Sequence, residues 1–507
     1  MITLEQALSN LHDGPEAVAR VIIEIFAAFE KLQRQNDELL QQNKELLQEN
    51  KELKRKVNEL ERKVSQLSKN SSNSSKPPSS DIVPPPQKQR QPGKRKIGAQ
   101  PGSPRYLRTL FAPEEIDFFH DYRLEVCPEC GHEEVTFLDQ PPRVQQQMEI
   151  KEILICKEEH RSWPVWCNRC GKIHYHPFPD AVVKEGLFKT RLSALVTYMK
   201  GIHHASYSTI RKFVRDVLGE KVSRGYLRKV VAKASAALEA PYTELLERVP
   251  LETVINVDET GHKENGEKFW TWVFRADLYV LFKIDKSRGS KVLLDVLGEQ
   301  FNGTLGCDYF SAYRKYMGDF DVTVQFCLAH LIRDIKYLTS LSDAGTSAYG
   351  KQLLKAVKAL FKVIHNEANL ESDALQKALA KARDHIQQVA LENVPSRLNS
   401  KGKELNKEAH NMAKRFRKHG KAYFEFITTP GVEPTNNLAE QAVRFVVIDR
   451  RITQGTRSEK GRETCERLWS VIGTCNLQGR SAFEFILTAL KAHFNGTTPP
   501  SLLPAPG

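Results

Sequence analysis

Three acidic residues that are far apart in the sequence stand where carboxylates could do chemistry. Asp258 follows the apolar, β-branched run VINV, Asp308 follows TLGC, and Glu440 lies one turn inside a helix predicted from EPTNNLAEQAVRF. Carboxylates are hard oxygen donors that suit Mg²⁺ or Mn²⁺. Two such ions about 3.5–4 Å apart can activate an attacking oxygen and stabilise the leaving one in an in-line displacement.

Each acid also has a simpler interpretation. Charge at a strand end favours solubility, and Glu440 can form an ion pair with Arg444 one helical turn on, which stabilises a helix by only tenths of a kcal/mol. Glu259 should point to the opposite face of its strand from Asp258, so we expect it to take no part in catalysis. Three further acids at turn or helix positions are expected to be surface charges: Asp277, Asp285 and Asp295.

The segments that must hold the acids change from strand to helix periodicity after Pro250. Strands are predicted over VINVDET, FWTWVFRA (269–276), LYVLFKID (278–285), TLGC and TVQFCLAH (323–330), with helices over KVLLDVLGE, after Asp308 and over LIRDIKYL. The order β-β-β-α-β-α-β-α is the ribonuclease-H-like layout, a mixed α/β sheet with helices on its faces. In that layout Asp258 ends the first strand and Asp308 ends the neighbouring fourth strand, so the two carboxylates face each other.

A long helical segment separates Asp308 from Glu440. Between residues 341 and 430 the apolar residues recur at helical spacing, and Lys and Arg crowd the later part, RLNSKGKELNKEAHNMAKRFRKHGK. We expect a helical insertion in the core. Such a basic insertion either covers DNA or is a solvated lid, and the sequence does not separate the two.

The first 70 residues carry a heptad repeat. Apolar residues recur every seven positions at Leu32, Leu39, Leu46, Leu53, Leu60 and Leu67, followed four positions later by Asn36, Asn43, Asn50, Val57 and Val64. Asparagine at such positions fixes register and favours two parallel strands. We therefore expect a homodimeric coiled coil, with a single amphipathic helix packed on its own protein as the alternative.

A basic linker and two cysteine pairs follow. Residues 71–112 are rich in Ser, Pro and Gln and cannot build a core, and seven Lys or Arg with no acid lie between Asp81 and Glu114. They form either a solvated linker or a basic arm that lies along phosphates. The cysteine pairs CPEC and CNRC, each followed by glycine, are typical of a structural, tetrahedral zinc site, with ligands Cys127, Cys130, Cys167 and Cys170.

The spacing of the cysteine pairs leaves alternatives. It is long for a compact zinc ribbon, so a strand pair must be inserted, and Cys156 and His160 within the insertion could replace a ligand. A set of reduced, buried, metal-free cysteines is the simpler interpretation.

Residues 191–234 have a helical pattern. Ser206 or Ser208 can cap one helix and Ser223 another, with Gly219 between them. The exposed face of the second helix offers basic side chains: Arg224, Arg228, Lys229 and Lys233. Two helices around a glycine turn, the second one basic, resemble a helix-turn-helix, although a plain helical hairpin fits nearly as well.

Composition narrows the choice of partner and compartment. The chain has 75 Lys and Arg against 62 Asp and Glu, a formal charge of +13, which favours nucleic acid first and an acidic membrane second. No apolar stretch reaches the ~18 residues of a membrane span, and MITLEQALSN lacks the features of a signal peptide. We expect a cytoplasmic, nucleoid-associated protein, in which nine cysteines, an odd number, indicate metal binding rather than disulfides.

The motifs together resemble a known family, the bacterial DDE transposases of the insertion-sequence sixty-six family. The matching stretches are the heptad helix, NSSKPPSSD, GAQPGSPR, both CxxC pairs, VDETG, CDYFSAY, CLAHLIRD, and PTNNLAEQAVR through RRITQGTRSEKGRETCERLWSVIGTC. The resemblance covers nearly the whole chain, and Ala99 in GAQPG, where the family often has glycine, is a mild departure.

The resemblance implies an activity and further residues. It implies a retroviral-integrase-like core with the catalytic acids Asp258, Asp308 and Glu440, two Mg²⁺ or Mn²⁺ ions, and DNA as substrate and target. It implies His330 and Cys327 near the site, and contacts with the DNA backbone from the segment after Glu440: Arg444, Arg450, Arg451 and Lys460. It also implies accessory transposition proteins encoded nearby.

Water would nick the element end and free a 3′-hydroxyl, which would then attack target DNA. Two other functions remain open on the sequence: a DNA-binding regulator with a repurposed core, and a nuclease that cleaves without joining.

The predicted domains are a coiled coil (1–70), a linker (71–112), a zinc-binding domain (113–180), a helix-turn-helix-like domain (181–245), a catalytic core (246–340 and 431–480) around a helical insertion (341–430), and a C-terminal helix and tail (481–507).

Overall fold

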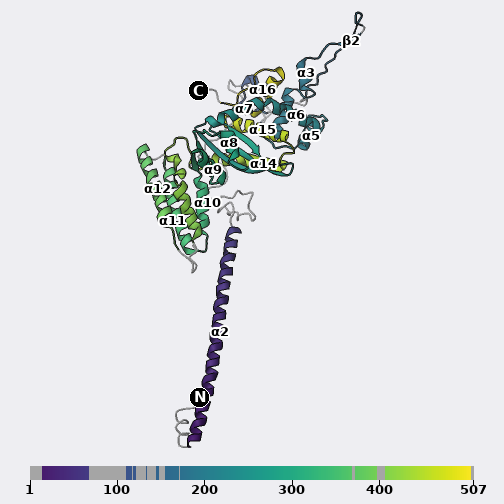
Figure 1. Ribbon diagram of the computed structural model, residues 1–507. Coiled ribbons are helices and arrows are strands. Elements are labelled where there is room, and N and C mark those ends of the chain that lie inside the picture. Colours follow the sequence, from purple (N-terminus) through teal and green to yellow (C-terminus); the bar gives the residue numbers. More distant parts are fainter. Residues whose placement is uncertain are drawn as a thin grey trace. The chain divides into compact units, whose positions relative to one another are not determined.

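The fold is described from a computed structural model of the chain (Figure 1). It describes residues 14–67, 110–116, 118–121, 129, 133, 144–147, 155–170, 172–367, 371–396 and 406–503. The chain divides into two compact units. The first contains residues 1–85 and 326–430, and the second contains residues 86–325 and 431–507.

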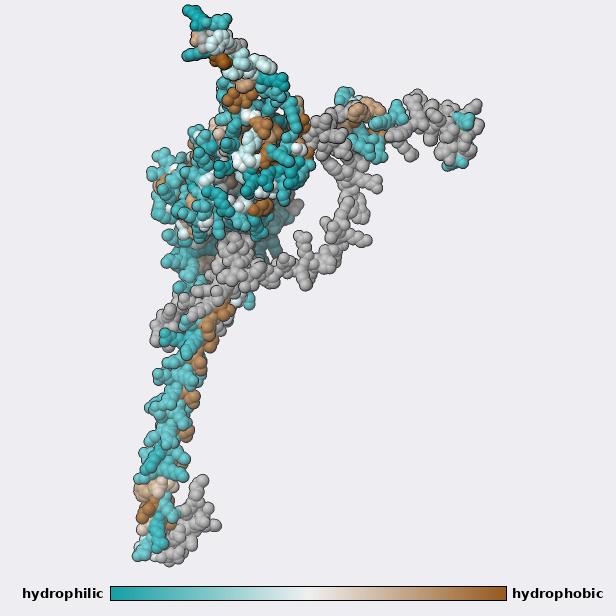
Figure 2. Space-filling view, turned by 90° about the vertical axis from the view of Figure 1, so that its right-hand side faces the viewer, coloured by the Kyte–Doolittle hydropathy of each residue, from teal (hydrophilic) through white to brown (hydrophobic). Residues whose placement is uncertain are grey.

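The amino-terminal part of the first unit is one long helix, α2, over Pro15–Leu67. The heptad residues keep their helical spacing, and the leucines Leu32, Leu39, Leu46, Leu53 and Leu60 are 52–64% exposed. Figure 2 shows hydrophobic residues in a row along this helix, among hydrophilic ones. The long helix is confirmed, and its apolar seam remains exposed in the single chain.

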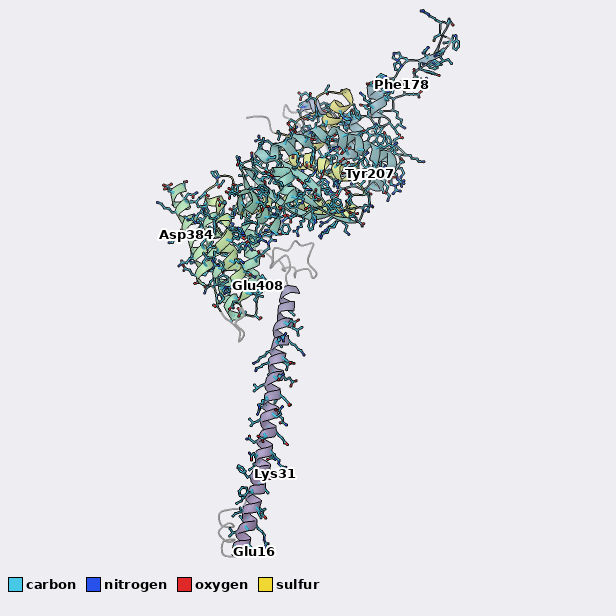
Figure 3. The ribbon with its side chains drawn as sticks, viewed as in Figure 1. Glu16, Lys31, Phe178, Tyr207, Asp384 and Glu408 are labelled. Carbon is cyan, nitrogen blue, oxygen red and sulfur yellow. The ribbon has the colours of Figure 1, made fainter. Side chains whose placement is uncertain are left out.

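The rest of the first unit is helical and contains the predicted insertion (341–430). It consists of α10 (Leu328–Thr339), α11 (Ala344–His365), α12 (Ser372–Glu392), α13 (Lys407–His419) and the short turns η5 (Lys421–Tyr423) and η6 (Glu425–Ile427). Asp384 in α12 and Glu408 in α13 are labelled in Figure 3. The Tyr349 hydroxyl of α11 donates to the Ala390 carbonyl oxygen of α12 at 2.9 Å, which fixes this pair of helices. The predicted helical character of the insertion is confirmed.

The second unit is built on a mixed five-stranded sheet in the order β5-β4-β3-β6-β7. Its strands are β3 (Val254–Glu264), β4 (Glu267–Arg275), β5 (Val280–Asp285), β6 (Thr304–Cys307) and β7 (Thr323–Phe326). The first three strands are antiparallel, and β6 is parallel to β3. With α8 (Lys291–Leu297) and α9 (Ser311–Phe320), this is the predicted order of elements.

Two predicted strand ends were wrong. The strand expected over residues 323–330 ends at Phe326, and Leu328 begins α10, so His330 lies in a helix. The amphipathic period of LAHLIRDIKYL extends back over these residues and prevails over their apolar character. The first strand does not end at Asp258 but continues to Glu264, because β4 pairs with it along its length through a turn at Asn265 and Gly266, both at positive φ.

Helices cover both faces of the sheet (Figure 1). On one face Val273 of β4 packs with Val446 of α14 (Asn437–Thr453) and Trp469 of α15 (Glu459–Leu477). On the other face the adjacent residue Trp272 meets Tyr313 of α9, with ring centroids 6.0 Å apart. The alternation of side chains along β4 therefore separates an α14 face from an α9 face.

Helix α15 also seals the edge strand β5. Amide groups of every second residue of β5 donate to side chains of α15 at 2.6–3.2 Å: Val280 to Thr474, Phe282 to Ser470 and Ile284 to Glu466. Gly473 permits this close approach, because a Cβ there would lie 2.4 Å from Val280 Cγ1. An edge strand otherwise presents a row of unpaired groups to other chains.

A helical domain precedes the sheet. It contains α3 (Asp180–Glu185), α4 (Thr190–Gly201), α5 (Tyr207–Asp216), α6 (Arg224–Ala237), α7 (Glu239–Arg248) and the turn η3 (Val249–Leu251), and the carboxy-terminal α16 (Ala482–Asn495) packs on α4 and α6. Ser206 caps α5, whose first residue Tyr207 is labelled in Figure 3, and Ser223 caps α6, as predicted. Residues 217–223 make a longer connection than the turn of a typical helix-turn-helix.

The remaining described elements are small. A turn, η2, covers Pro113–Glu115, and β1 (Pro164–Cys167) pairs with β2 (Lys172–Tyr175) in an antiparallel hairpin. Within the described ranges no helix has a stretch long and apolar enough to cross a lipid bilayer.

Candidate active site

Asp258 and Asp308 come together through the register of two parallel strands. The β3–β6 ladder ends with Asn256 opposite Gly306, and each acid stands two residues beyond that pair. Side chains two apart on a strand share a face, so both acids continue one row on the same side of the sheet. Asp258 lies opposite Val273, which places it on the α14 face.

Glu440 reaches the same face because two asparagines tie the start of α14 to β3. Asn436, which precedes the helix, donates through Nδ2 to the Val257 carbonyl oxygen at 2.8 Å. Its Oδ1 accepts from Asn256 Nδ2 at 2.9 Å. Both asparagines are buried, and Glu440 lies in the first turn of the helix that they hold.

A glycine in β6 makes room for this asparagine bridge. A Cβ on Gly306 would lie 2.3 Å from Asn256 Nδ2, so a side chain there would push the amide away. Sequence reasoning missed Asn256, Asn436 and Gly306. The available signals were a glycine inside an apolar strand and the Asn pair that follows Pro434.

The three acids lie close enough for their charges to interact. Each is half-buried. The pKa of Asp258 is raised well above its usual range, mainly because burial disfavours the charged form and because Glu259 and Asp308 carry charge nearby. Glu440 adds a smaller push in the same direction. Like charges gathered in this way are stabilised by a cation between them.

Glu259 points to the opposite face, as predicted, but it is not a surface charge. It pairs in register with Trp272 on the α9 face and is only 8% exposed. Its carboxylate accepts from Arg288 at 2.7 Å and from the Tyr313 hydroxyl. Burial and then the nearby charge of Asp308 raise the pKa of Glu259 to about 7, although both partners favour its charged form.

The donor set on the α14 face fits divalent metal ions. Three carboxylates from β3, the end of β6 and α14 offer oxygen ligands, which Mg²⁺ and Mn²⁺ prefer. Burial is the main cause of the raised pKa of Asp258, and the charges of the nearby acids add to it; a cation there would balance these charges. In contrast, the carboxylate of Glu259 is already matched by a guanidinium and a hydroxyl.

Comparison with known families agrees with this geometry. The model of the transposase IS66 family matches residues 185–464, more than half of the chain, including all three acids. The chain belongs to this family. It is a transposase of the DDE type, which implies action on DNA and divalent metal ions. A second model, of a family of unknown function, matches residues 27–108, and no curated protein matches the chain.

Two predicted neighbours of the acids in this transposase, Cys327 and His330, lie in the first unit. Cys327 precedes α10, His330 is in its first turn, and both are buried. The pKa of His330 is lowered to about 4, because burial and then the charge of Arg333 disfavour the imidazolium. The imidazole is therefore neutral near pH 7, and a role beside the acids stays a prediction.

The predicted DNA-binding residues of the transposase fall into two groups. Most have exposed side chains: Arg224, Arg228 and Lys229 on α6, and Arg444, Arg451 and Lys460 on or after α14. The other group faces the protein. Arg450 is half-buried and donates to the Gly261 carbonyl oxygen and to Thr260 Oγ1, so it holds α14 against β3. Lys233 donates to the last carbonyl oxygens of α3, at Lys184 and Glu185, and is likewise engaged.

The structure describes only some of the predicted zinc ligands. Cys127, Cys130 and the side chain of Cys167 lie outside the described residues. The second CxxC pair forms the turn of the β1–β2 hairpin, and Cys170 Sγ lies 3.1 Å from His174 Nε2. His174 is a polar neighbour of a predicted zinc ligand that sequence reasoning missed.

Proposed function

We propose that this transposase cleaves DNA at the ends of an insertion element and joins the freed ends to target DNA. Asp258, Asp308 and Glu440 serve as ligands for two Mg²⁺ or Mn²⁺ ions. The observation that carries the proposal is the convergence of these half-buried carboxylates on the α14 face, where the charges of Asp308 and Glu440 add to burial and to the charge of Glu259 in raising the pKa of Asp258.

Each reaction is an in-line displacement at phosphorus. In the first, a water oxygen forms a bond to phosphorus, the bond to the 3′ oxygen breaks, and the element end is left with a 3′-hydroxyl. In the second, that hydroxyl attacks a target phosphodiester, so one P–O bond is exchanged for another. When bound, the two ions supply positive charge that activates the attacking oxygen and stabilises the leaving one.

The protein's part is to hold the acids in place before the reaction. Asp258 and Asp308 are fixed by adjacent strands, and Glu440 is fixed by the asparagine bridge at the start of α14. Each aspartate also accepts a local backbone amide: Asp258 Oδ1 from Glu259 at 2.9 Å and Asp308 Oδ1 from Phe310 at 2.8 Å. Such preorganisation is the main contribution that a protein makes to phosphoryl transfer.

DNA contacts and partners extend the proposal. The exposed cations Arg224, Arg228 and Lys229 on α6 contact one DNA segment, and Arg444, Arg451 and Lys460 contact the backbone near the acids. The exposed heptad seam of α2 pairs with that of a second copy in a parallel coiled coil. The proposal also includes a structural zinc ion bound by the CxxC pairs, accessory proteins encoded nearby and a nucleoid-associated location.

Purified full-length protein with labelled DNA that carries the native element ends provides the test. Wild type is expected to cleave and join this DNA in Mg²⁺ and to lose both activities in EDTA. Asp308→Asn and Glu440→Gln should abolish both. Asp295→Asn is the matched control, because Asp295 is an exposed acid on α8 of the same unit.

The outcomes separate the competing functions. Cleavage without joining by wild type would favour a nuclease. Specific binding to the ends without metal-dependent cleavage would favour a regulator. Normal cleavage by Asp308→Asn would show that the acids are wrongly assigned.

A further inference from the structure

The α9 face of the sheet carries a second acidic group beside the proposed metal ligands. Glu259, Arg288 and Tyr313 form a connected group, here called the Glu259 clamp. Arg288 donates to Glu259 Oε1 through Nε at 3.0 Å and Nη2 at 2.7 Å, and the Tyr313 hydroxyl donates to Oε2. Glu259 is 8% exposed and Tyr313 is fully buried.

Aromatic rings hold the cation of the clamp in position. The Arg288 guanidinium lies over the Trp270 ring at 4.4 Å and over the Phe310 ring at 4.0 Å. Planar stacking of this kind restricts a guanidinium more than a single ion pair does. The orientation of Arg288, and with it that of Glu259, is therefore set by both β4 and the segment after Asp308.

The clamp joins the two chain segments that carry the aspartates to the segment after β5. Glu259 adjoins Asp258 in β3, Arg288 follows β5, and Tyr313 lies in α9 just after Asp308. The amide of Glu259 donates to Asp258, and the amide of Phe310, whose ring stacks on Arg288, donates to Asp308. The clamp is thus connected to Asp258 through one peptide unit and to Asp308 through Phe310.

We propose that the Glu259 clamp is a positioning device that sets the separation between Asp258 and Asp308 for metal binding. The inference rests on the proposed function, because it assumes that these two aspartates bind the ions. Glu259 is not a ligand itself, since it faces away from them. Stability alone does not explain the clamp, because a well-packed apolar group commonly serves as well as a buried ion pair.

Two tyrosines of α9 allow a matched experiment. Tyr313→Phe removes the hydroxyl that binds Glu259 and keeps the ring. Tyr316→Phe removes a buried hydroxyl one turn on, which donates to the Gly298 carbonyl oxygen at 2.5 Å and is not part of the clamp. Both exchanges delete one buried hydrogen bond from the same helix.

The readouts are the dissociation constant for Mn²⁺, from electron paramagnetic resonance of the free ion with the full-length protein, and the Mg²⁺ concentration for half-maximal cleavage of element-end DNA. Tyr313→Phe is expected to raise both by at least fivefold, and Tyr316→Phe to leave both within twofold of wild type. Arg288→Lys, which keeps the charge but loses the paired hydrogen bonds, should act like Tyr313→Phe and replaces it if that variant does not fold.

Three outcomes are distinguishable. A selective loss of metal affinity in Tyr313→Phe or Arg288→Lys supports the clamp. Equal metal dependence in the Tyr313 and Tyr316 variants, with an active wild type, overturns the clamp and leaves the proposed function intact. A wild type without metal-dependent cleavage, or an active Asp308→Asn, overturns the proposed function and the clamp with it.

Discussion

Asp258 and Glu259 are consecutive acids on one strand, and the two faces of the sheet treat them differently. On the α14 face, Asp258 is half-buried beside Asp308 and Glu440, and its pKa is raised first by burial and then by the charges of the nearby acids, Glu259 included. On the α9 face, Glu259 is buried, and its carboxylate accepts hydrogen bonds from the Arg288 guanidinium and the Tyr313 hydroxyl. Residue type does not distinguish the proposed ligand from its neighbour; the difference is that Glu259 accepts from a guanidinium and a hydroxyl.

The contrast also separates stability from activity. An acid among like charges destabilises the fold without metal, so its removal should cost activity but not stability. An acid paired with a buried cation should instead cost stability when it is removed, and through the clamp also metal affinity. Four predictions follow this division, beginning with the largest effect.

Replacing Asp258 gives the sharpest test of the α14 face. Asp258→Asn is expected to reduce cleavage of element-end DNA at least a thousandfold, because the metal site loses a ligand. The free energy of unfolding without metal should stay equal or increase, since one repulsive charge is removed. Parallel cleavage assays and urea unfolding measure both, and a destabilised variant would contradict the contrast.

Replacing Glu259 tests the α9 face. Glu259→Ala leaves the Arg288 guanidinium and the Tyr313 hydroxyl without their shared acceptor, and should lower the free energy of unfolding by about 3 kcal/mol. Urea unfolding followed by tryptophan fluorescence reports on this region, because Trp270 and Trp272 adjoin the clamp. An unchanged midpoint would mean that the ion pair contributes nothing and that Glu259 resembles a surface acid.

His262 lies in a part of the α14 face that is closed to solvent. It lies on the same face as Asp258, but it is 2% exposed, and burial lowers its pKa to about 4. Between pH 6.5 and 4 the unfolded chain binds this proton and the folded chain does not, so stability is lost as the pH falls below 6.5. At pH 5 the loss is about 2 kcal/mol.

The matching experiment compares wild type with His262→Gln by urea unfolding at pH 7 and pH 5. The variant should lose about 2 kcal/mol less than wild type between these two values, since the side chain that replaces His262 does not titrate there. Identical losses would mean that His262 is accessible to protons in the folded state and that the face is open farther along β3.

The asparagine bridge tests whether Glu440 needs a fixed helix start. Asn436→Ala removes the hydrogen bonds to Val257 and Asn256 and should lower the cleavage rate about tenfold, while Glu440 itself is retained. Asn437→Ala, at the adjacent exposed position, is the control and should cleave normally. Equal rates in the two variants would show that the bridge does not position Glu440.

Local periodicity was enough to predict the frame of this site. The change to strand spacing after Pro250 indicated the order of strands, and that order placed Asp258 beside Asp308. The caps at Ser206 and Ser223 were predictable for the same reason, because the interactions involved lie within one helical turn.

Local periodicity did not predict the long-range contacts. The bond between Asn256 and Asn436 joins residues 180 positions apart, and no spacing rule connects them. The alternation of β3 correctly placed Glu259 on the other face, but the partners that bury it come from a loop and a helix that only the folded sheet brings together. His330 was misplaced because a short apolar run fits both a strand and the first turn of a helix.

Iron-directed cleavage of the protein backbone locates the metal site most directly. Full-length protein is loaded with Fe²⁺ in place of Mg²⁺ and treated with ascorbate and peroxide, and the fragments are mapped by mass spectrometry. Cuts next to residues 258, 308 and 440 are expected, all suppressed by excess Mg²⁺ and by Asp258→Asn. Cuts that cluster elsewhere and spare these three segments would contradict a metal site on the α14 face.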